Sequence, residues 1–169
     1  RNVAQGNLFI GNGVRNTGGI RIVGEDQIVR NNRFFSLTGD RFFSALALMN
    51  AVPNSLPNRY MQVKNVKLED NVFVDCASIE FGTGNDFERT LAPVDIDFVR
   101  NVIVNESLDF PYEAVSEVDG FRFKGNKAAL TASAALPKGF ARIGRPSYDI
   151  PSYESVAAGK GASWYRRPE

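Results

Sequence analysis

Residues 66–74, with the sequence Val-Lys-Leu-Glu-Asp-Asn-Val-Phe-Val, decide the fold. In this stretch the apolar Leu68 is followed by Asn71 and then by the apolar Phe73. The same unit recurs at Ala4–Asn7–Phe9, Val29–Asn32–Phe34, Phe98–Asn101–Ile103 and Phe123–Asn126–Ala128. Successive asparagines are 25, 39, 30 and 25 residues apart. Repeats of this length are typical of a solenoid, in which each unit packs on its neighbours.

Each unit is predicted to be two short strands joined by a sharp turn at the asparagine. Apolar residues alternate before the turn, as in Val66/Leu68 and Ile96/Phe98, which is the period of a strand with one buried face. Asparagine tolerates the left-handed backbone conformation that a tight turn requires. Stacked strands lie about 4.8 Å apart, so equivalent asparagine amides would be hydrogen bonded in a ladder. We therefore predict an all-β chain forming a right-handed parallel β-helix, in which the repeated asparagines are structural.

Two segments depart from the repeat. Residues 42–49 have helical propensity, but a helix there would interrupt the stack, so we predict a strand. From about residue 128 the pattern fades into an Ala-rich stretch and then a segment with prolines, tyrosines and one tryptophan. We predict that residues 1–127 form the coils and that residues 128–169 are an irregular C-terminal cap of the same domain, folded back on the last coils.

Composition excludes several classes of protein. The 169 residues contain no histidine, which removes Ser-His-Asp sites, histidine bases and nearly all zinc sites. A net charge of +1 argues against a nucleic-acid binder, and no apolar run is long enough to cross a membrane. The single cysteine, Cys76, lies in an apolar run and is predicted to be a buried thiol. Arginine outnumbers lysine, which suits bidentate recognition of carboxylate or sulfate groups.

Four segments resemble family 6 polysaccharide lyases, which include alginate lyases and chondroitinase B. They are residues 16–35 (NTGGIRIVGE running into VRNNRFF), residues 45–60 (ALALMN, VPNS and NRY), residues 78–90 (SIEFG and DFERT) and residues 161–164 (GASW). The resemblance covers residues 1–126 well and the tail loosely. It supports the parallel β-helix independently of the asparagine repeat.

The resemblance implies β-elimination at a uronic acid of an acidic polysaccharide. In the family a calcium ion neutralises the sugar carboxylate, a lysine removes the C5 proton and an arginine assists the leaving oxygen. These groups belong to coils that precede the segment matching Arg1, and nothing here matches the lysine or the calcium carboxylates. We therefore expect no catalytic residue and no calcium ligand in this chain. We expect it to supply the C-terminal half of the substrate groove, beside an upstream half of the same β-helix, in a secreted or periplasmic protein.

Three arginines are the first candidates for binding the acidic sugar. Arg21 would face the groove next to the catalytic coil; its alternative role is a structural ion pair. Arg41 matches an arginine that contacts the acidic sugar in chondroitinase B, and its alternative is a loop arginine paired with Asp40. Arg89 corresponds loosely to a basic pair in the same enzyme, and its alternative is a solvated loop charge.

A polar loop supplies three further substrate-binding candidates, Asn50, Arg59 and Tyr60. We predict that Tyr60 stacks on a sugar ring while Asn50 bonds hydroxyl groups; the alternative is a set of turn-forming residues. The segments around residues 50–60 and 80–90 favour alginate over dermatan sulfate as the polymer.

Other acidic residues suggest different functions. The pairs Asp95/Asp97 and Glu69/Asp70 invite comparison with a glycosidase, but their alternation with core residues favours a solvated strand face. Residues 82–86 (GTGND) are oxygen-rich but lack the spacing of a calcium-binding loop. A non-catalytic, glycan-binding β-helix remains the alternative function, because it would need the same groove without the lysine and arginine pair.

Overall fold

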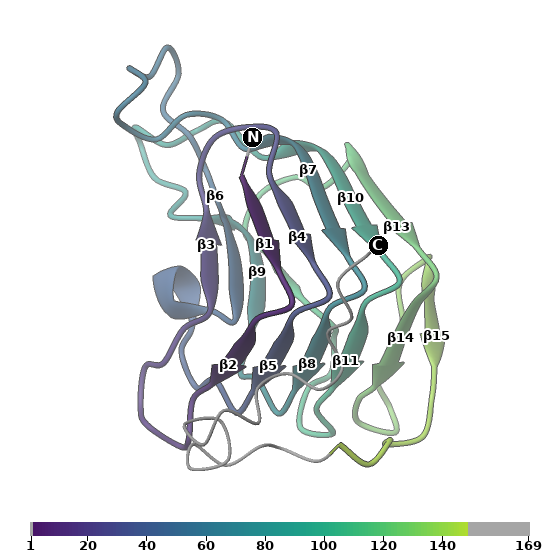
Figure 1. Cartoon of the computed structure of the whole chain (residues 1–169). Helices are drawn as coiled ribbons and strands as arrows, with labels where there is room; N and C mark the ends of the chain where they lie inside the picture. The colour runs from purple at the N-terminus through teal and green to yellow at the C-terminus, as the bar shows by residue number, and fades with distance from the viewer. Residues whose placement is uncertain (1, 149–169) are drawn as a thin grey trace, which may run out of the picture.

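A computed structural model describes residues 2–148 of the chain. Its strands stack in parallel into three sheets, and each of the first four turns of the chain contributes one strand to each sheet in order (Figure 1). Sheet A consists of β1 (Val3–Gln5), β4 (Ile28–Arg30), β7 (Lys64–Glu69), β10 (Val94–Val99) and β13 (Phe121–Lys124). Sheet B consists of β2 (Leu8–Ile10), β5 (Arg33–Phe35), β8 (Val72–Val74), β11 (Val102–Val104), β14 (Asn126–Ala129) and β15 (Phe140–Arg142). Sheet C consists of β3 (Ile20–Ile22), β6 (Leu46–Met49), β9 (Ile79–Thr83) and β12 (Glu113–Ala114). This is the predicted right-handed parallel β-helix.

The predicted asparagine ladder lies at the corner between sheets A and B. The side-chain amide of each asparagine donates to the Oδ1 atom of the next, at 2.9 Å for Asn7 to Asn32, 3.0 Å for Asn32 to Asn71 and 3.0 Å for Asn71 to Asn101. The last step, from Asn101 to Asn126, is 3.3 Å. Each Oδ1 also accepts the backbone N–H of the preceding asparagine in the ladder. The ladder therefore saturates polar groups that the stacking of coils would otherwise bury unpaired.

We expected the asparagine of each turn to adopt the left-handed backbone conformation. In the structure the residue before the asparagine adopts it. Positive φ angles occur at Gly6 (67°), Asn31 (52°), Asp70 (57°), Arg100 (55°) and Gly125 (65°). The ladder asparagine must keep an extended backbone, because its side chain has to point along the stack into the next coil. The strain of the corner is therefore carried by a neighbour whose side chain points outward.

Inward-pointing side chains from all three sheets fill the interior. Phe9, Phe34 and Phe73 occupy equivalent positions on neighbouring strands of sheet B and stack face to face, with ring centroids 4.7 and 4.6 Å apart. Toward the C-terminal coils the interior is aromatic, with Phe81, Phe98, Tyr112, Phe121, Phe123 and Phe140 in mutual contact. Cys76 is buried here too, as predicted.

Residues 42–49 contain both a turn and a strand. The strand prediction holds for β6, while a 3-10 turn, η1 (Arg41–Phe43), precedes it. This is the only helical element within residues 2–148, and none there is long and apolar enough to cross a membrane.

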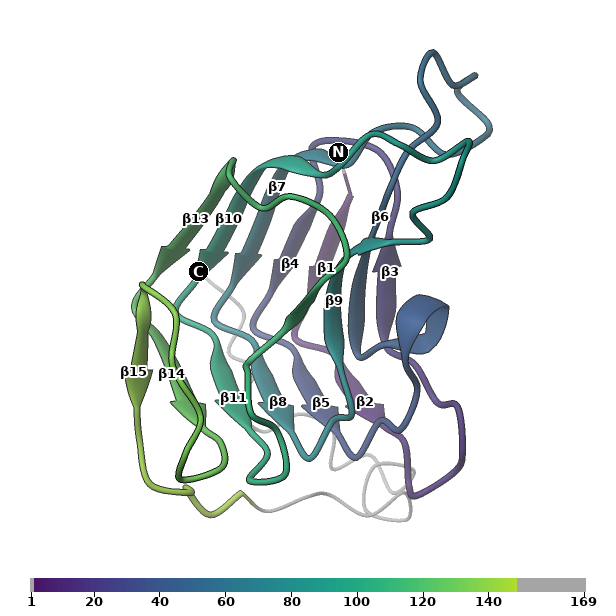
Figure 2. The same ribbon diagram turned by 180° about the vertical axis from the view of Figure 1, so that it is seen from behind.

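The boundary that we placed at residue 127 falls inside β14. β14 and β15 continue sheet B as far as Arg142 because they pair in parallel with the preceding coil (Figure 2). Beyond them, Arg145 pairs with Asp75 at 2.6 Å and Arg33 lies 6.0 Å from the Tyr148 ring. Residues 143–148 therefore run back across the outer face of sheet B. The remainder of the predicted cap, residues 149–169, lies outside the described residues.

Candidate substrate-binding site

The outer face of sheet C carries one row of residues across the coils. Ile20 and Ile22 of β3 point inward, so Arg21 between them points outward. Strand register places Arg21 beside Ala47, Ala47 beside Glu80 and Glu80 beside Glu113. The strand spacing of about 4.8 Å puts Arg21 about 10 Å from Glu80 along the row.

A pocket of about 460 Å³ opens over the later part of this row. Its lining comes from sheet C, from η1 and from the loop after β9, and consists of Arg41, Phe42, Glu80, Gly84, Asn85, Asp86, Arg89, Glu113 and Val115. Two of the predicted arginines, Arg41 and Arg89, therefore share one pocket. It is the candidate site for an acidic sugar.

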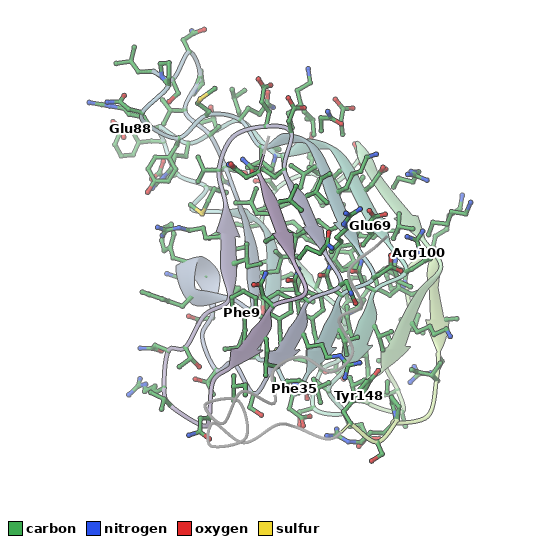
Figure 3. All side chains as sticks on the ribbon, in the orientation of Figure 1. Phe9, Phe35, Glu69, Glu88, Arg100 and Tyr148 are labelled. Carbon is green, nitrogen blue, oxygen red and sulfur yellow. The ribbon has the colours of Figure 1, made fainter. Side chains whose placement is uncertain are left out.

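The loop after β9 forms one wall of the pocket, and its base is joined to that of the loop after β6. Ala51 and Leu91 exchange backbone hydrogen bonds at 2.9 and 3.0 Å, so the loops after β6 and β9 leave the solenoid together. Figure 1 shows both at the same corner of the β-helix, and Figure 3 shows Glu88 at a projecting end of this region.

Arg89 is held in place by Asp86. Its Nε donates to Asp86 Oδ2 at 3.1 Å, a second guanidinium nitrogen donates to the same oxygen, and its backbone N–H donates to Oδ1 at 2.8 Å. These hydrogen bonds lower the pKa of Asp86 to about 2. The guanidinium carbon lies 5.2 Å from the centre of the Tyr60 ring and 5.8 Å from that of Phe42. Arg89 is thus held between two aromatic rings, and only part of its guanidinium is free to bind a ligand.

Arg41 and Arg21 are less restrained than Arg89. Arg41 begins η1 with a φ of 49°, is exposed, and its side chain makes no hydrogen bond or ion pair within residues 2–148; the pairing with Asp40 that we considered is absent there. Arg21 lies outside the large pocket, beside a hollow of about 310 Å³ at the first two coils whose lining includes Val3 of β1 and Val29 of β4. Both are cations open to solvent.

Asn50 has a structural role in place of the sugar contact that we predicted. It is 1 % exposed, its Nδ2 donates to the backbone oxygen of Arg89 at 3.1 Å, and its Oδ1 accepts from Ser116 at 3.0 Å. Its amide therefore fixes the loop that carries Arg89. Arg59 lies in the exposed loop after β6 and does not line the pocket.

The pocket also contains Phe42 and Glu80, which were not among the site residues predicted from the sequence. Phe42 follows Arg41, and its only sequence signal was its place in an apolar run that we assigned to a strand. Glu80 interrupts the apolar stretch from Ile79 to Phe81, which is a usable signal for a residue on the outer face of the strand. Its side chain is only 2 % exposed.

The remaining acidic pairs belong to structural ion pairs. Asp97 accepts from Arg122 at 2.6 Å, which lowers the Asp97 pKa, and Arg100 pairs with Glu69 at 3.2 Å and with Asp70 at 2.7 Å on the outside of sheet A (Figure 3). A glycosidase-like pair of carboxylates is not formed by these residues.

The described residues do not fit a calcium site. Both oxygens of Asp86 in the Gly82–Asp86 loop are engaged by the Arg89 segment. Within residues 2–148, no group of three or more acidic, cysteine or histidine side chains is placed to hold a metal ion.

Comparison with known proteins places this architecture among the carbohydrate-active β-helices. The sequence matches the family described as Chondroitinase B over residues 1–142, and the chain belongs to that family, within the family 6 polysaccharide lyases.

Solved structures agree with this assignment. The chain is 42 % identical to the PL6 family alginate lyase AlyGC, with a TM-score of 0.77, over 85 % of this chain and 20 % of that one. A mannuronic acid specific family 6 lyase from human gut microbiota shares the fold, with a TM-score of 0.64 and 21 % identity over 96 % of this chain and 40 % of that one. The chain thus spans less than half the length of either structure. A search of curated protein sequences gives no match.

Proposed function

We propose that the protein carrying this chain is a lyase that cleaves alginate by β-elimination, and that this chain forms the C-terminal half of its substrate groove. The observation that carries the proposal is the 42 % identity with an alginate lyase over 85 % of the chain. The acidic polysaccharide would lie across the coils on the outer face of sheet C.

The row on sheet C suits a polyuronate. A sugar in such a polymer advances by a length similar to the strand spacing of about 4.8 Å, so cations on different coils can meet carboxylates of different sugars. Arg41 offers an unpaired guanidinium that can bind a carboxylate through two hydrogen bonds. The rings of Phe42 and Tyr60 provide apolar surface for the face of a sugar.

Proton transfer would be performed by residues outside this chain. The resemblance assigns the lysine base, the arginine that assists the leaving group and the calcium ligands to preceding coils, and no side chain described here fits those roles. Calcium, when bound upstream, would neutralise the carboxylate of the reacting sugar. Because alginate is an extracellular polymer, we also propose that the protein is secreted or periplasmic.

The test is product formation from two polymers. The protein carrying this chain should produce ultraviolet-absorbing unsaturated sugar ends from alginate and few from dermatan sulfate, while residues 1–169 alone should produce none. Arg41→Ala should raise KM for alginate about tenfold, since a charge-assisted hydrogen bond contributes roughly 1.5–3 kcal/mol. Arg15→Ala, at an exposed position away from the pocket, is the control and should leave KM unchanged.

Two results would overturn the proposal. Binding of alginate without unsaturated products would favour the non-catalytic glycan-binding alternative. Faster cleavage of dermatan sulfate than of alginate would show that the polymer is misassigned.

A further inference from the structure

Glu80 is a buried carboxylate without a partner. It lies in the middle of β9, between the inward-pointing Ile79 and Phe81, so its side chain faces the pocket and not the core. It is 2 % exposed, its Oε2 receives no hydrogen bond, and its carboxylate forms no ion pair within residues 2–148. An isolated buried carboxylate is costly to the fold. A donor that reaches this carboxylate from the pocket would offset that cost.

The donor does not come from the arginines of the pocket. Arg89 is committed to Asp86, and Arg41 makes no contact with Glu80 short enough to be an ion pair. The nearest group in register is Glu113, another carboxylate, and burial together with the charges of Glu80 and Asp40 raises the Glu113 pKa. A ligand that enters the pocket can supply this donor.

The chemistry of the pocket favours hydroxyl groups over a metal ion as the partner of the Glu80 carboxylate. Calcium takes six to eight oxygen ligands, and the described residues offer no group of three acidic side chains for a metal here. A uronate, by contrast, carries a carboxylate and free hydroxyls on one ring. The pocket presents both complements, an unpaired guanidinium at Arg41 and an unpaired carboxylate at Glu80.

We propose that Glu80 accepts hydrogen bonds from the free hydroxyls of the uronate whose carboxylate binds Arg41, and that it selects sugars without sulfate at that position. This inference rests on the proposed function. A sulfate ester would replace a hydrogen-bond donor by a negative charge facing both Glu80 and Glu113, which is unfavourable in a partly desolvated pocket. The pocket thereby discriminates within the acidic polysaccharides, accepting alginate and excluding sulfated uronate polymers.

Substitution of Glu80 by glutamine tests the proposal because the two side chains have nearly the same shape. In the protein carrying this chain, Glu80→Gln should weaken binding of unsulfated alginate oligosaccharides about tenfold, since a charged acceptor becomes neutral. Binding of uronate oligosaccharides of equal length that carry a sulfate ester on the uronate should stay the same or strengthen. Glu88→Gln, which removes an equal charge from the exposed loop near the pocket, should change neither affinity.

Thermal unfolding of the free protein distinguishes ligand binding from a structural role. Removal of an unpaired buried charge should raise the unfolding midpoint of Glu80→Gln, whereas the loss of a structural contact would lower it. A lowered midpoint, or an equal change in affinity for both polymers, overturns the role of Glu80. If the unsubstituted protein binds and cleaves alginate but the variant keeps its preference, only this inference fails. If the unsubstituted protein binds neither polymer, the proposed function fails with it.

Discussion

Replacement of Asn71 by alanine tests whether the asparagine ladder stabilises the fold. Asn71 is 0 % exposed and takes part in four side-chain hydrogen bonds. Its Oδ1 accepts from the backbone N–H and the Nδ2 of Asn32 at 3.1 and 3.0 Å, and its Nδ2 donates to Val29 O at 2.9 Å and Asn101 Oδ1 at 3.0 Å.

The expected magnitude follows from which partners are left unpaired. Asn32 Nδ2 keeps a bond to Ala4 O, and Asn101 Oδ1 keeps the backbone N–H of Asn71. The backbone N–H of Asn32 loses its acceptor, at about 1–3 kcal/mol, and the other lost bonds contribute about 0.5–1.5 kcal/mol each. Together these terms amount to about 2.5–7.5 kcal/mol, so we expect Asn71→Ala to lower the free energy of unfolding by at least about 2.5 kcal/mol.

Urea titration followed by circular dichroism measures this loss, and two further substitutions calibrate it. Asn7→Ala removes the exposed end of the ladder and should cost less than about 1 kcal/mol. Asn58→Ala, in the exposed loop after β6, should cost almost nothing. Equal losses for Asn71→Ala and Asn7→Ala would refute the idea that burial makes the ladder stabilising.

Three other outcomes follow from single positions. Burial raises the pKa of Cys76 to about 12, so alkylation by iodoacetamide should occur in denaturant and hardly at all in the folded protein; rapid labelling of the native state would contradict this. A Cβ at Gly19 would lie 2.2 Å from the backbone oxygen of Ala45, the residue before β6, so Gly19→Ala should lower the free energy of unfolding by about 2 kcal/mol or more. Gly144→Ala, where a Cβ would have no neighbour within 4 Å, should leave it unchanged in the same urea titration. The ionised Asp86 stabilises its loop, and because its pKa is lowered to about 2, this stabilisation is fully present above about pH 4 and is lost as the pH falls toward about 2. Cleavage of the loop by pepsin should therefore increase as the pH falls from about 4 to about 2, and Asp86→Asn should show the increased cleavage already at about pH 4.

The fold was predictable because its determinant is repeated in sequence. Five asparagines in equivalent positions, each between apolar residues, define the corner, and every coil confirms the others. The turn residue before each asparagine was not predictable by the same means. Glycine, asparagine, aspartate and arginine all occupy that position, so no shared residue type marks it.

The site was less predictable than the fold because it depends on which outer surfaces the loops cover. Arg41 and Arg89 were found through resemblance, and the structure brings them together. Asn50 was assigned to the substrate because it belongs to a polar loop, but neighbouring segments take up both ends of its amide. Glu80 was not predicted as a site residue, because no feature of the neighbouring sequence shows that the outer face of β9 is covered.

The corner between sheets A and B also has a consequence for how such proteins change. In the first four coils the chain always spends two residues there, whereas the connection from sheet C back to sheet A varies from the short link after β3 to the long loop after β6. Lengthening a loop costs little closure entropy, and here it leaves the register of the stack untouched. Segments that shape the pocket can therefore be exchanged between relatives as separate modules, so that a new polymer preference can be acquired without re-optimising the scaffold.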